Sequence, residues 1–254
     1  MNLIYAFVIA FSMYSKIPMP RVDWTKERMR YTFCFFPMIG AVIGVLMFLW
    51  EKYGRILTGE NAFFTAVLIL IPIVITGGIH MDGFLDTSDA LSSYKTMDEK
   101  LEILKDSHAG AFAIIMGICY FVLDFGVYSA VTEDVMRVLA VGFLLSRSLS
   151  GMSVVTFKMA KKSGLAATFS DMAQKRTVGI VMGVYIAGCL IVMLAIHRIL
   201  GLTAFVTAVA VFFYYRHMAY KKFGGITGDL AGFFLQVCEL AMAFTTVIAA
   251  NICL

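Results

Sequence analysis

The chain has 254 residues, of which 60% are hydrophobic and only 15% are charged, and its formal net charge is +4. Soluble domains carry about 25% charged residues, and a mean hydropathy of +0.85 leaves too few polar side chains to cover a soluble globule. Composition therefore excludes a soluble globular enzyme, a disordered chain and a coiled coil, and it predicts a polytopic membrane protein. The small net charge gives no support to nucleic-acid binding.

Eight charge-poor segments are long enough, or nearly long enough, to cross a membrane. A transmembrane helix needs about 20 apolar residues, and lipid cannot satisfy open backbone groups, which favours helices. The first segment is short, so it either spans the bilayer or lies at its interface. We therefore predict a single-domain, all-α integral membrane bundle, residues 1–254, with seven or eight transmembrane helices. The segments are Asn2–Ser15, Phe33–Trp50, Ala62–Thr76, Ala109–Val131, Val138–Phe157, Val178–Ile196, Ile199–Tyr215 and Leu230–Leu254.

The polar segments between these helices are asymmetric in charge and length. When they are assigned alternately to two sides, one set carries 16 of the 21 lysines and arginines and the other carries four. The positive-inside rule makes the first set cytoplasmic. Because the same set holds every long polar loop, we expect an active site at the cytoplasmic face of a bacterial or archaeal plasma (inner) membrane. The cytoplasmic set is 16–32, 77–108, 158–177 and 216–229, and the opposite set is 51–61, 132–137 and 197–198.

The stretch from Gly77 to Leu91 carries three aspartates at helical spacing. Asp82, Asp86 and Asp89 stand at i, i+4 and i+7, which places them at about 0°, 40° and −20° around a helix. Carboxylates this close repel one another and need a positive partner. Carboxylate oxygens suit Mg²⁺ or Mn²⁺. We therefore predict a divalent-metal site here, with a solvated acidic face as the alternative.

His80 and a second acidic motif adjoin this predicted metal site. His80 could be a metal ligand, a proton donor or a capping group. Asp106 and Ser107 precede the next apolar segment, where they could cap its helix. Because small residues follow this helix start, it could also bind a phosphate group. We predict Asp106 as a further metal ligand and Ser107 as a binding residue.

A third polar motif joins two lysines to a glycine-rich turn before the last helix. Glycines permit close backbone approach, and a glycine-rich turn beside lysines is typical of a phosphate cradle. A flexible loop is the alternative. The predicted binding residues are Lys221, Lys222, Gly224, Gly225, Thr227 and Gly228, and Asp229 follows them.

Two charges lie inside predicted spans. Arg147 and Glu239 stand about 15 Å from the cytoplasmic ends of their helices at 1.5 Å per residue. Charges at that depth are costly and are usually paired or functional. Arg147 is therefore either a phosphate-binding residue or the ion-pair partner of Glu239.

Taken together, these motifs resemble the adenosylcobinamide-GDP ribazoletransferase (cobalamin synthase) family. The motifs occur in the same order as in the family and cover most of the chain. The most specific of them is the His-x-Asp-Gly-x-x-Asp-x-x-Asp block. It rests on Gly78–Asp89, on Asp106-Ser107 with Gly110-Ala111, on Gly224–Asp229, and on Lys16-Ile17-Pro18 and Phe36-Pro37 with Gly40 and Gly44.

The resemblance implies a late step of coenzyme B12 biosynthesis. Adenosylcobinamide-GDP would react with α-ribazole or its 5′-phosphate at the bilayer surface and release GMP, with Mg²⁺ as the expected cofactor and Mn²⁺ as a substitute. A homo-oligomer or association with other B12-assembly enzymes is also compatible with it. Asp82, Asp86, Asp89 and Asp106 would hold metal, and Asp229 or His80 would take the hydroxyl proton. Arg147, Lys221 and Lys222 would contact phosphate oxygens.

Two other functions remain open at this point. A CDP-alcohol phosphotransferase-like lipid synthase has a related aspartate spacing, but the Asp-Gly-x-x-Ala-Arg half of its motif is absent, since Asp82-Gly83 is followed by Phe84-Leu85-Asp86-Thr87. A non-enzymatic transporter would place coupling charges near mid-membrane, often in internal repeats. This chain shows no repeat, and most of its carboxylates fall at one face.

Overall fold

A computed structural model describes residues 2–59, 62–106, 108–161 and 165–253. Within these ranges the regular structure is helical, apart from one isolated bridge between Met159 and Ile226, so the predicted all-α fold is confirmed. The elements are α1 (Asn2–Tyr14), α2 (Lys26–Met29), η1 (Thr32–Phe35), α3 (Phe36–Thr58), α4 (Ala62–Thr76), α5 (Ile79–Ser92), α6 (Met97–Ile103), α7 (Ala111–Ser129), α8 (Glu133–Thr156), α9 (Leu165–Met172), α10 (Lys175–Ile196), α11 (Arg198–Phe223) and α12 (Gly228–Cys253).

Six of the described helices are long and apolar enough to cross a membrane, namely α3, α7, α8, α10, α11 and α12. The pair α4 and α5 would make a seventh span, broken by a bend of 95°. Helix α1 has 13 residues, about 20 Å at 1.5 Å per residue, which is shorter than a hydrocarbon core of about 30 Å. The structure therefore agrees with the lower of the two predicted span numbers.

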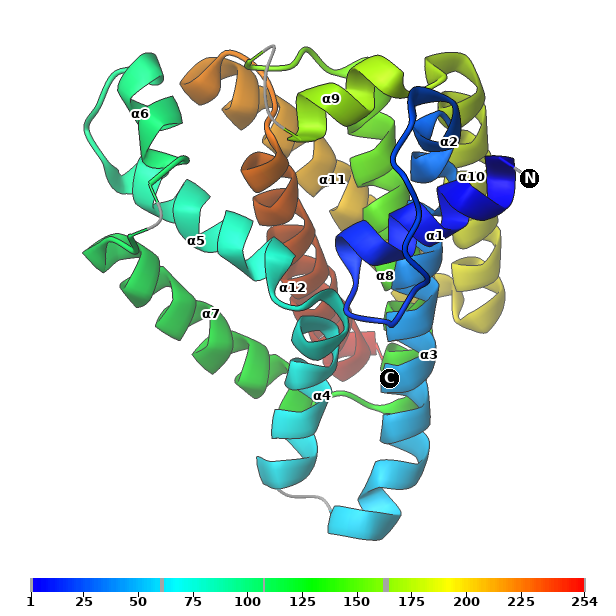
Figure 1. Ribbon diagram of the computed structural model, residues 1–254. Helices are drawn as coiled ribbons and strands as arrows, with labels where there is room; N and C mark the ends of the chain where they lie inside the picture. Colours follow the sequence, from blue (N-terminus) through cyan, green and yellow to red (C-terminus); the bar gives the residue numbers. More distant parts are fainter. Residues whose placement is uncertain (1, 60–61, 107, 162–164, 254) are drawn as a thin grey trace.

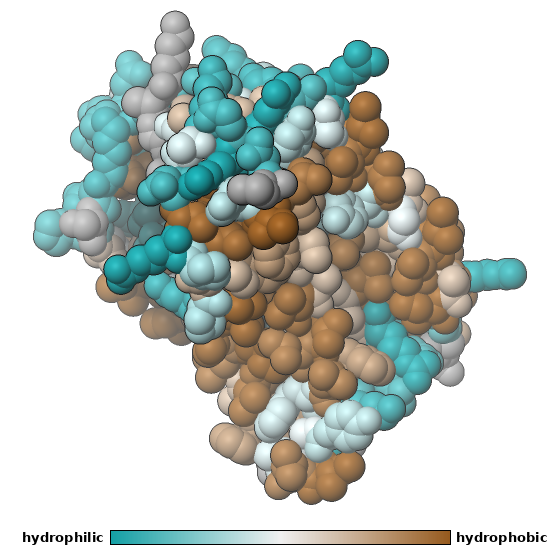
Figure 2. Space-filling model, turned by 45° about the vertical axis from the view of Figure 1, so that its right-hand side comes forward, coloured by the Kyte–Doolittle hydropathy of each residue, from teal (hydrophilic) through white to brown (hydrophobic). Residues whose placement is uncertain are grey.

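The surface of the bundle is divided between an apolar flank and a polar end. Figure 1 shows α6 and α9 at one end, opposite the C-terminal end of α3 and the start of α4. Hydrophilic side chains gather at the end that carries α6 and α9, and hydrophobic side chains cover much of the flank (Figure 2). On α10 and α11, for example, Val184, Ile191 and Leu202 are exposed. This division is what a bilayer-embedded bundle requires.

Helices α3 and α8 pack with their backbones in direct contact. A Cβ atom on Gly40 would lie 2.1 Å from the carbonyl oxygen of Phe143, and one on Gly44 would lie 2.1 Å from that of Ala140. Glycines four residues apart on one helix face permit this close approach in membrane helices. The contact fixes α8 against α3 and thereby positions the polar residues in the second half of α8.

Gly44→Ala is expected to destabilise the bundle by about 1–3 kcal/mol, because the new methyl group forces α3 away from α8. The midpoint of thermal unfolding in detergent should fall. Gly183→Ala is the matched control, since no atom lies within 4 Å of the Cβ position there and alanine favours a helix. Equal midpoints for both variants would contradict the close α3–α8 contact.

Candidate active site

The α4–α5 bend is built by two glycines with left-handed backbone angles. Gly77 has a φ of 65° and Gly78 a φ of 79°, a region that other residues rarely adopt. The amide of Gly78 donates to the carbonyl of Ile73 at 3.0 Å, which closes the end of α4. The bend turns α5 across the bundle, so that its aspartates lie beside α12 rather than continuing the direction of α4 (Figure 1).

Helices α5 and α12 meet through two further glycines. A Cβ atom on Gly83 would lie 2.7 Å from the carbonyl oxygen of Asp229, and one on Gly232 would lie 2.9 Å from that of His80. The rings of Phe84 and Phe233 stack beside this contact, with centroids 5.6 Å apart. This close packing brings two motifs that are almost 150 positions apart in the sequence into one site.

Five carboxylates converge on this region. The negative charges of Asp82, Asp229, Asp89 and Asp106 all repel that of Asp86. No lysine or arginine in the described ranges forms an ion pair with Asp82, Asp86 or Asp89. The three α5 aspartates therefore lie on one helix, and within the described ranges none of the three has a lysine or arginine as an ion-pair partner.

The donor set of this cluster fits a hard divalent cation, because all its members are carboxylates. No three histidine, cysteine, aspartate or glutamate side chains of the described residues are close enough to enclose a metal by themselves. Mg²⁺ is commonly held by one or two carboxylates together with substrate phosphates. The cluster is thus compatible with an ion shared between protein and a phosphorylated ligand.

Asp106 lies at the edge of the cluster in the loop before α7. Its carboxylate accepts hydrogen bonds from the backbone amide of His108 at 3.0 Å and lies 2.8 Å from the His108 ring nitrogen Nδ1. These bonds hold the pKa of Asp106 below its ordinary value. Its side chain is exposed. Ser107, the other predicted residue of this motif, lies outside the described residues.

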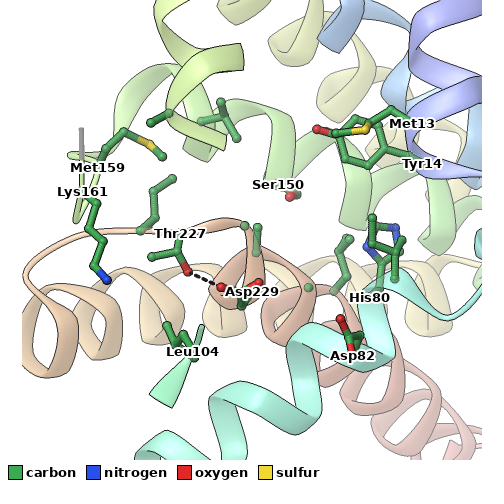
Figure 3. A pocket seen from close by; sticks show the side chains of 18 of the residues that line it. Met13, Tyr14, His80, Asp82, Leu104, Ser150, Met159, Lys161, Thr227 and Asp229 are labelled. Carbon is green, nitrogen blue, oxygen red and sulfur yellow. Dashed lines mark hydrogen bonds between the residues drawn. The ribbon is translucent and has the colours of Figure 1, made fainter. Parts of the chain in front are cut away.

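A cavity of about 480 Å³ opens beside the carboxylates. Figure 3 shows His80 and Asp82 at one end with Met13 and Tyr14, Lys161 and Thr227 at the other, and Asp229 between them. Phe33 and Phe36 add aromatic surface to the His80 end, and Lys105 adds positive charge to the Lys161 end. The cavity therefore combines an apolar aromatic part with a part that carries both acidic and basic groups.

His80 is buried in the wall of this cavity, where the ring of Phe36 packs against it edge-on with centroids 6.0 Å apart. Its Nε2 atom has no hydrogen-bond partner among the described residues. A buried polar atom without a partner costs free energy unless a ligand or water supplies one. A role for His80 as metal ligand or proton donor stays a prediction, whereas capping is not its role, since Gly78 stands at the N-cap of α5.

The glycine-rich turn reaches the cavity only with its last residues. Thr227, Gly228 and Asp229 line the cavity, and the Thr227 hydroxyl lies 3.5 Å from Asp229 Oδ2. Lys221 and Lys222 are exposed on α11 and do not line it, and neither do Gly224 and Gly225. The two predicted lysines therefore lie outside the cavity.

Among the described residues, the lysines that line the cavity are Lys105 and Lys161, not Lys221 and Lys222. The amide of Ile226 donates to the carbonyl of Lys158 at 2.9 Å, and the amide of Ala160 donates to the carbonyl of Ile226 at 2.9 Å. This pairing carries Lys161 to the cavity beside Thr227. Both lysines belong to loops that the charge distribution assigns to the cytoplasmic side of the membrane. Their positions at the cavity depend on tertiary contacts, which cannot be predicted from the local sequence.

Arg147 is buried away from the cavity and pairs with Glu239. Its Nη1 atom lies 2.6 Å from Glu239 Oε1, and the Ser146 hydroxyl donates to the same oxygen at 2.7 Å. Arg147 does not line the cavity. Of the two roles predicted for Arg147, the structure shows the ion pair.

Comparison with known proteins identifies a consistent set of relatives. The profile of the cobalamin-5-phosphate synthase family matches residues 6–247. A protein of Lachnoclostridium phytofermentans named adenosylcobinamide-GDP ribazoletransferase is 50% identical over 244 residues, covering 96% of this chain and 94% of the relative. Proteins with the same name from Clostridium perfringens and Clostridium botulinum are 31% and 32% identical, each over at least 94% of both chains. No solved structure matches the chain.

Proposed function

Since the chain belongs to the cobalamin-5-phosphate synthase family, we propose that it transfers the corrinoid phosphate of adenosylcobinamide-GDP to α-ribazole or its 5′-phosphate and releases GMP. The observation that carries the chemistry is that Asp82, His80 and Asp229 line one cavity. They come from two helices that touch through glycines, so their relative positions are fixed by backbone packing.

The proposed reaction is a displacement at phosphorus. A hydroxyl oxygen of the acceptor ribose forms a bond to the corrinoid-linked phosphorus, the bond from that phosphorus to the bridging oxygen breaks, and GMP leaves with the bridging oxygen. The hydroxyl proton passes to a base, for which His80 Nε2 and the Asp229 carboxylate are the candidates. Two observations support these candidates: His80 Nε2 has no hydrogen-bond partner among the described residues, and Asp229 lies in the middle of the cavity (Figure 3).

We propose that the acidic cluster binds the cofactor of this reaction, a divalent metal ion. Mg²⁺, with Mn²⁺ as a substitute, would neutralise charge on the diphosphate oxygens when bound. The residues proposed to hold it are Asp82, Asp86, Asp89 and Asp106. Asp82 is the member of this set that also lines the cavity, so it is the carboxylate best placed to share an ion with substrate.

We also propose that the cavity faces the cytoplasm from the inner membrane. The polar end of the bundle carries α6 and α9 (Figures 1 and 2), and these helices belong to the loops that hold 16 of the 21 lysines and arginines. Positive charge is retained on the cytoplasmic side of a membrane. Substrates made in the cytoplasm would reach the carboxylates from that side.

A donor assay in purified membranes tests the proposed function. We expect GMP release from adenosylcobinamide-GDP that depends on α-ribazole or its 5′-phosphate. Release of CMP from a CDP-linked lipid would instead identify a lipid synthase, and uptake of substrate into proteoliposomes without turnover would identify a transporter. Membranes prepared without expression of the chain provide the baseline for all three measurements.

A further inference from the structure

A second hollow of about 550 Å³ lies on the other side of Asp82. It is formed where the end of α1 meets the α4–α5 bend, and its lining includes Ser12, Lys16 and Thr76. Three residues line both this hollow and the cavity described above, namely Met13, Ile79 and Asp82. Asp82 is the only polar side chain of the three, so the two spaces meet at a proposed metal ligand.

Lys16 is held at the second hollow by the α4–α5 bend itself. Its amide donates to the carbonyl of Ile75 at 2.7 Å. Its aliphatic chain lies over Gly77, where a Cβ atom would come within 2.2 Å of the Lys16 Cε atom. None of the described acidic residues forms an ion pair with Lys16. The hollow therefore has one fixed lysine whose charge is not taken up by a protein carboxylate.

The first cavity carries two lysines at its far end. Lys161 Nζ donates to the carbonyl of Leu101 at 3.0 Å and lies 3.4 Å from a Glu102 carboxylate oxygen. Lys105 Nζ lies 2.8 Å from the same Glu102 oxygen. Glu102 is exposed at this rim, so anionic oxygens of a ligand can replace it as the partner of both lysines. The end opposite His80 is thus suited to two adjacent phosphate groups, whereas the Lys16 hollow is suited to one.

We propose that the two substrates occupy separate hollows that meet at Asp82. The donor diphosphate lies in the first cavity against Lys105 and Lys161, and the 5′-phosphate of the acceptor lies in the second hollow against Lys16. This assignment rests on the proposed function, and it follows from the number of phosphate groups: two lysines face the two groups of the diphosphate, and one faces the single group of the monoester. It brings the attacking hydroxyl and the reacting phosphorus together at the wall that the hollows share, as a transfer between two substrates requires.

The assignment separates the kinetic roles of the lysines. Lys16→Ala should raise KM for α-ribazole 5′-phosphate at least about tenfold, the size of one lost charge-assisted hydrogen bond. It should leave KM for unphosphorylated α-ribazole and for the donor unchanged. Lys161→Ala should raise KM for the donor by a similar factor and leave KM for either acceptor unchanged. Lys26→Ala and Lys95→Ala, which remove exposed lysines outside both hollows, are the matched controls.

Equilibrium binding in EDTA provides a readout that does not depend on turnover. Lys16→Ala should weaken binding of α-ribazole 5′-phosphate but not of α-ribazole, and Lys161→Ala should weaken binding of GDP. The proposal is overturned if Lys16→Ala affects both acceptors equally, changes GDP binding, or has no effect on the phosphorylated acceptor. A wild-type protein that releases no GMP from the donor would refute the proposed function instead, and the binding titrations would still decide the assignment of the hollows.

Discussion

Replacing Asp82 by alanine is expected to reduce GMP release by about a thousandfold while the protein remains folded. Asp82 is exposed at the wall shared by both hollows, and its carboxylate is proposed to stabilise charge at the diphosphate. Removing a single group that stabilises transition-state charge costs about 10²–10³ in rate. Folding should be preserved because the side chain is not packed in the core and because its removal relieves repulsion on Asp86.

Two measurements together test the role of Asp82. Turnover should be measured over a range of Mg²⁺ concentrations, and thermal unfolding should be measured in the same detergent. Asp82→Asn keeps the shape of the side chain and should lose activity in the same way. Asp98→Ala, which removes an exposed carboxylate of α6, is the control for a general change in charge. Near-normal turnover of Asp82→Ala at saturating Mg²⁺ would contradict the proposed metal role.

The helices and the α5 aspartates could be predicted from the sequence because both are local signals. Apolar length predicts a span, and the spacing of Asp82, Asp86 and Asp89 predicts their common face. The 95° bend between α4 and α5 was not predicted. It depends on positive φ angles at Gly77 and Gly78, and two adjacent glycines in a sequence are equally compatible with a flexible loop.

The basic residues of the site could not be predicted because their positions depend on tertiary contacts. Lys221 and Lys222 adjoin a glycine-rich turn in sequence, yet they are exposed on α11. Lys161 reaches the cavity through the pairing of its loop with Ile226, and Lys16 reaches the second hollow through the hydrogen bond of its amide to Ile75 at the α4–α5 bend. Charge counting assigned these lysines to one group of loops but gave no information on which of them line the site.

Removing either member of the Arg147–Glu239 pair is expected to destabilise the bundle more than any other single change considered. Both side chains are buried between α8 and α12 and lie 2.6 Å apart. Deleting one partner leaves an uncompensated buried charge, which costs about 3–5 kcal/mol. For a chain of this size that loss lowers the unfolding midpoint by about 10 °C. Arg147→Met and Glu239→Gln should each show this fall in detergent.

The double variant separates the ion pair from a phosphate-binding role for Arg147. When Arg147→Met is combined with Glu239→Gln, no unpaired charge remains, and the Gln amide oxygen can still accept the Ser146 hydroxyl. The unfolding midpoint should therefore recover most of the loss caused by either single change. A different result would support phosphate binding: Arg147→Met would unfold at the wild-type temperature, show a raised KM for the donor, and gain nothing from the second substitution. Because Arg147 lies outside the cavity, recovery of stability is the expected outcome.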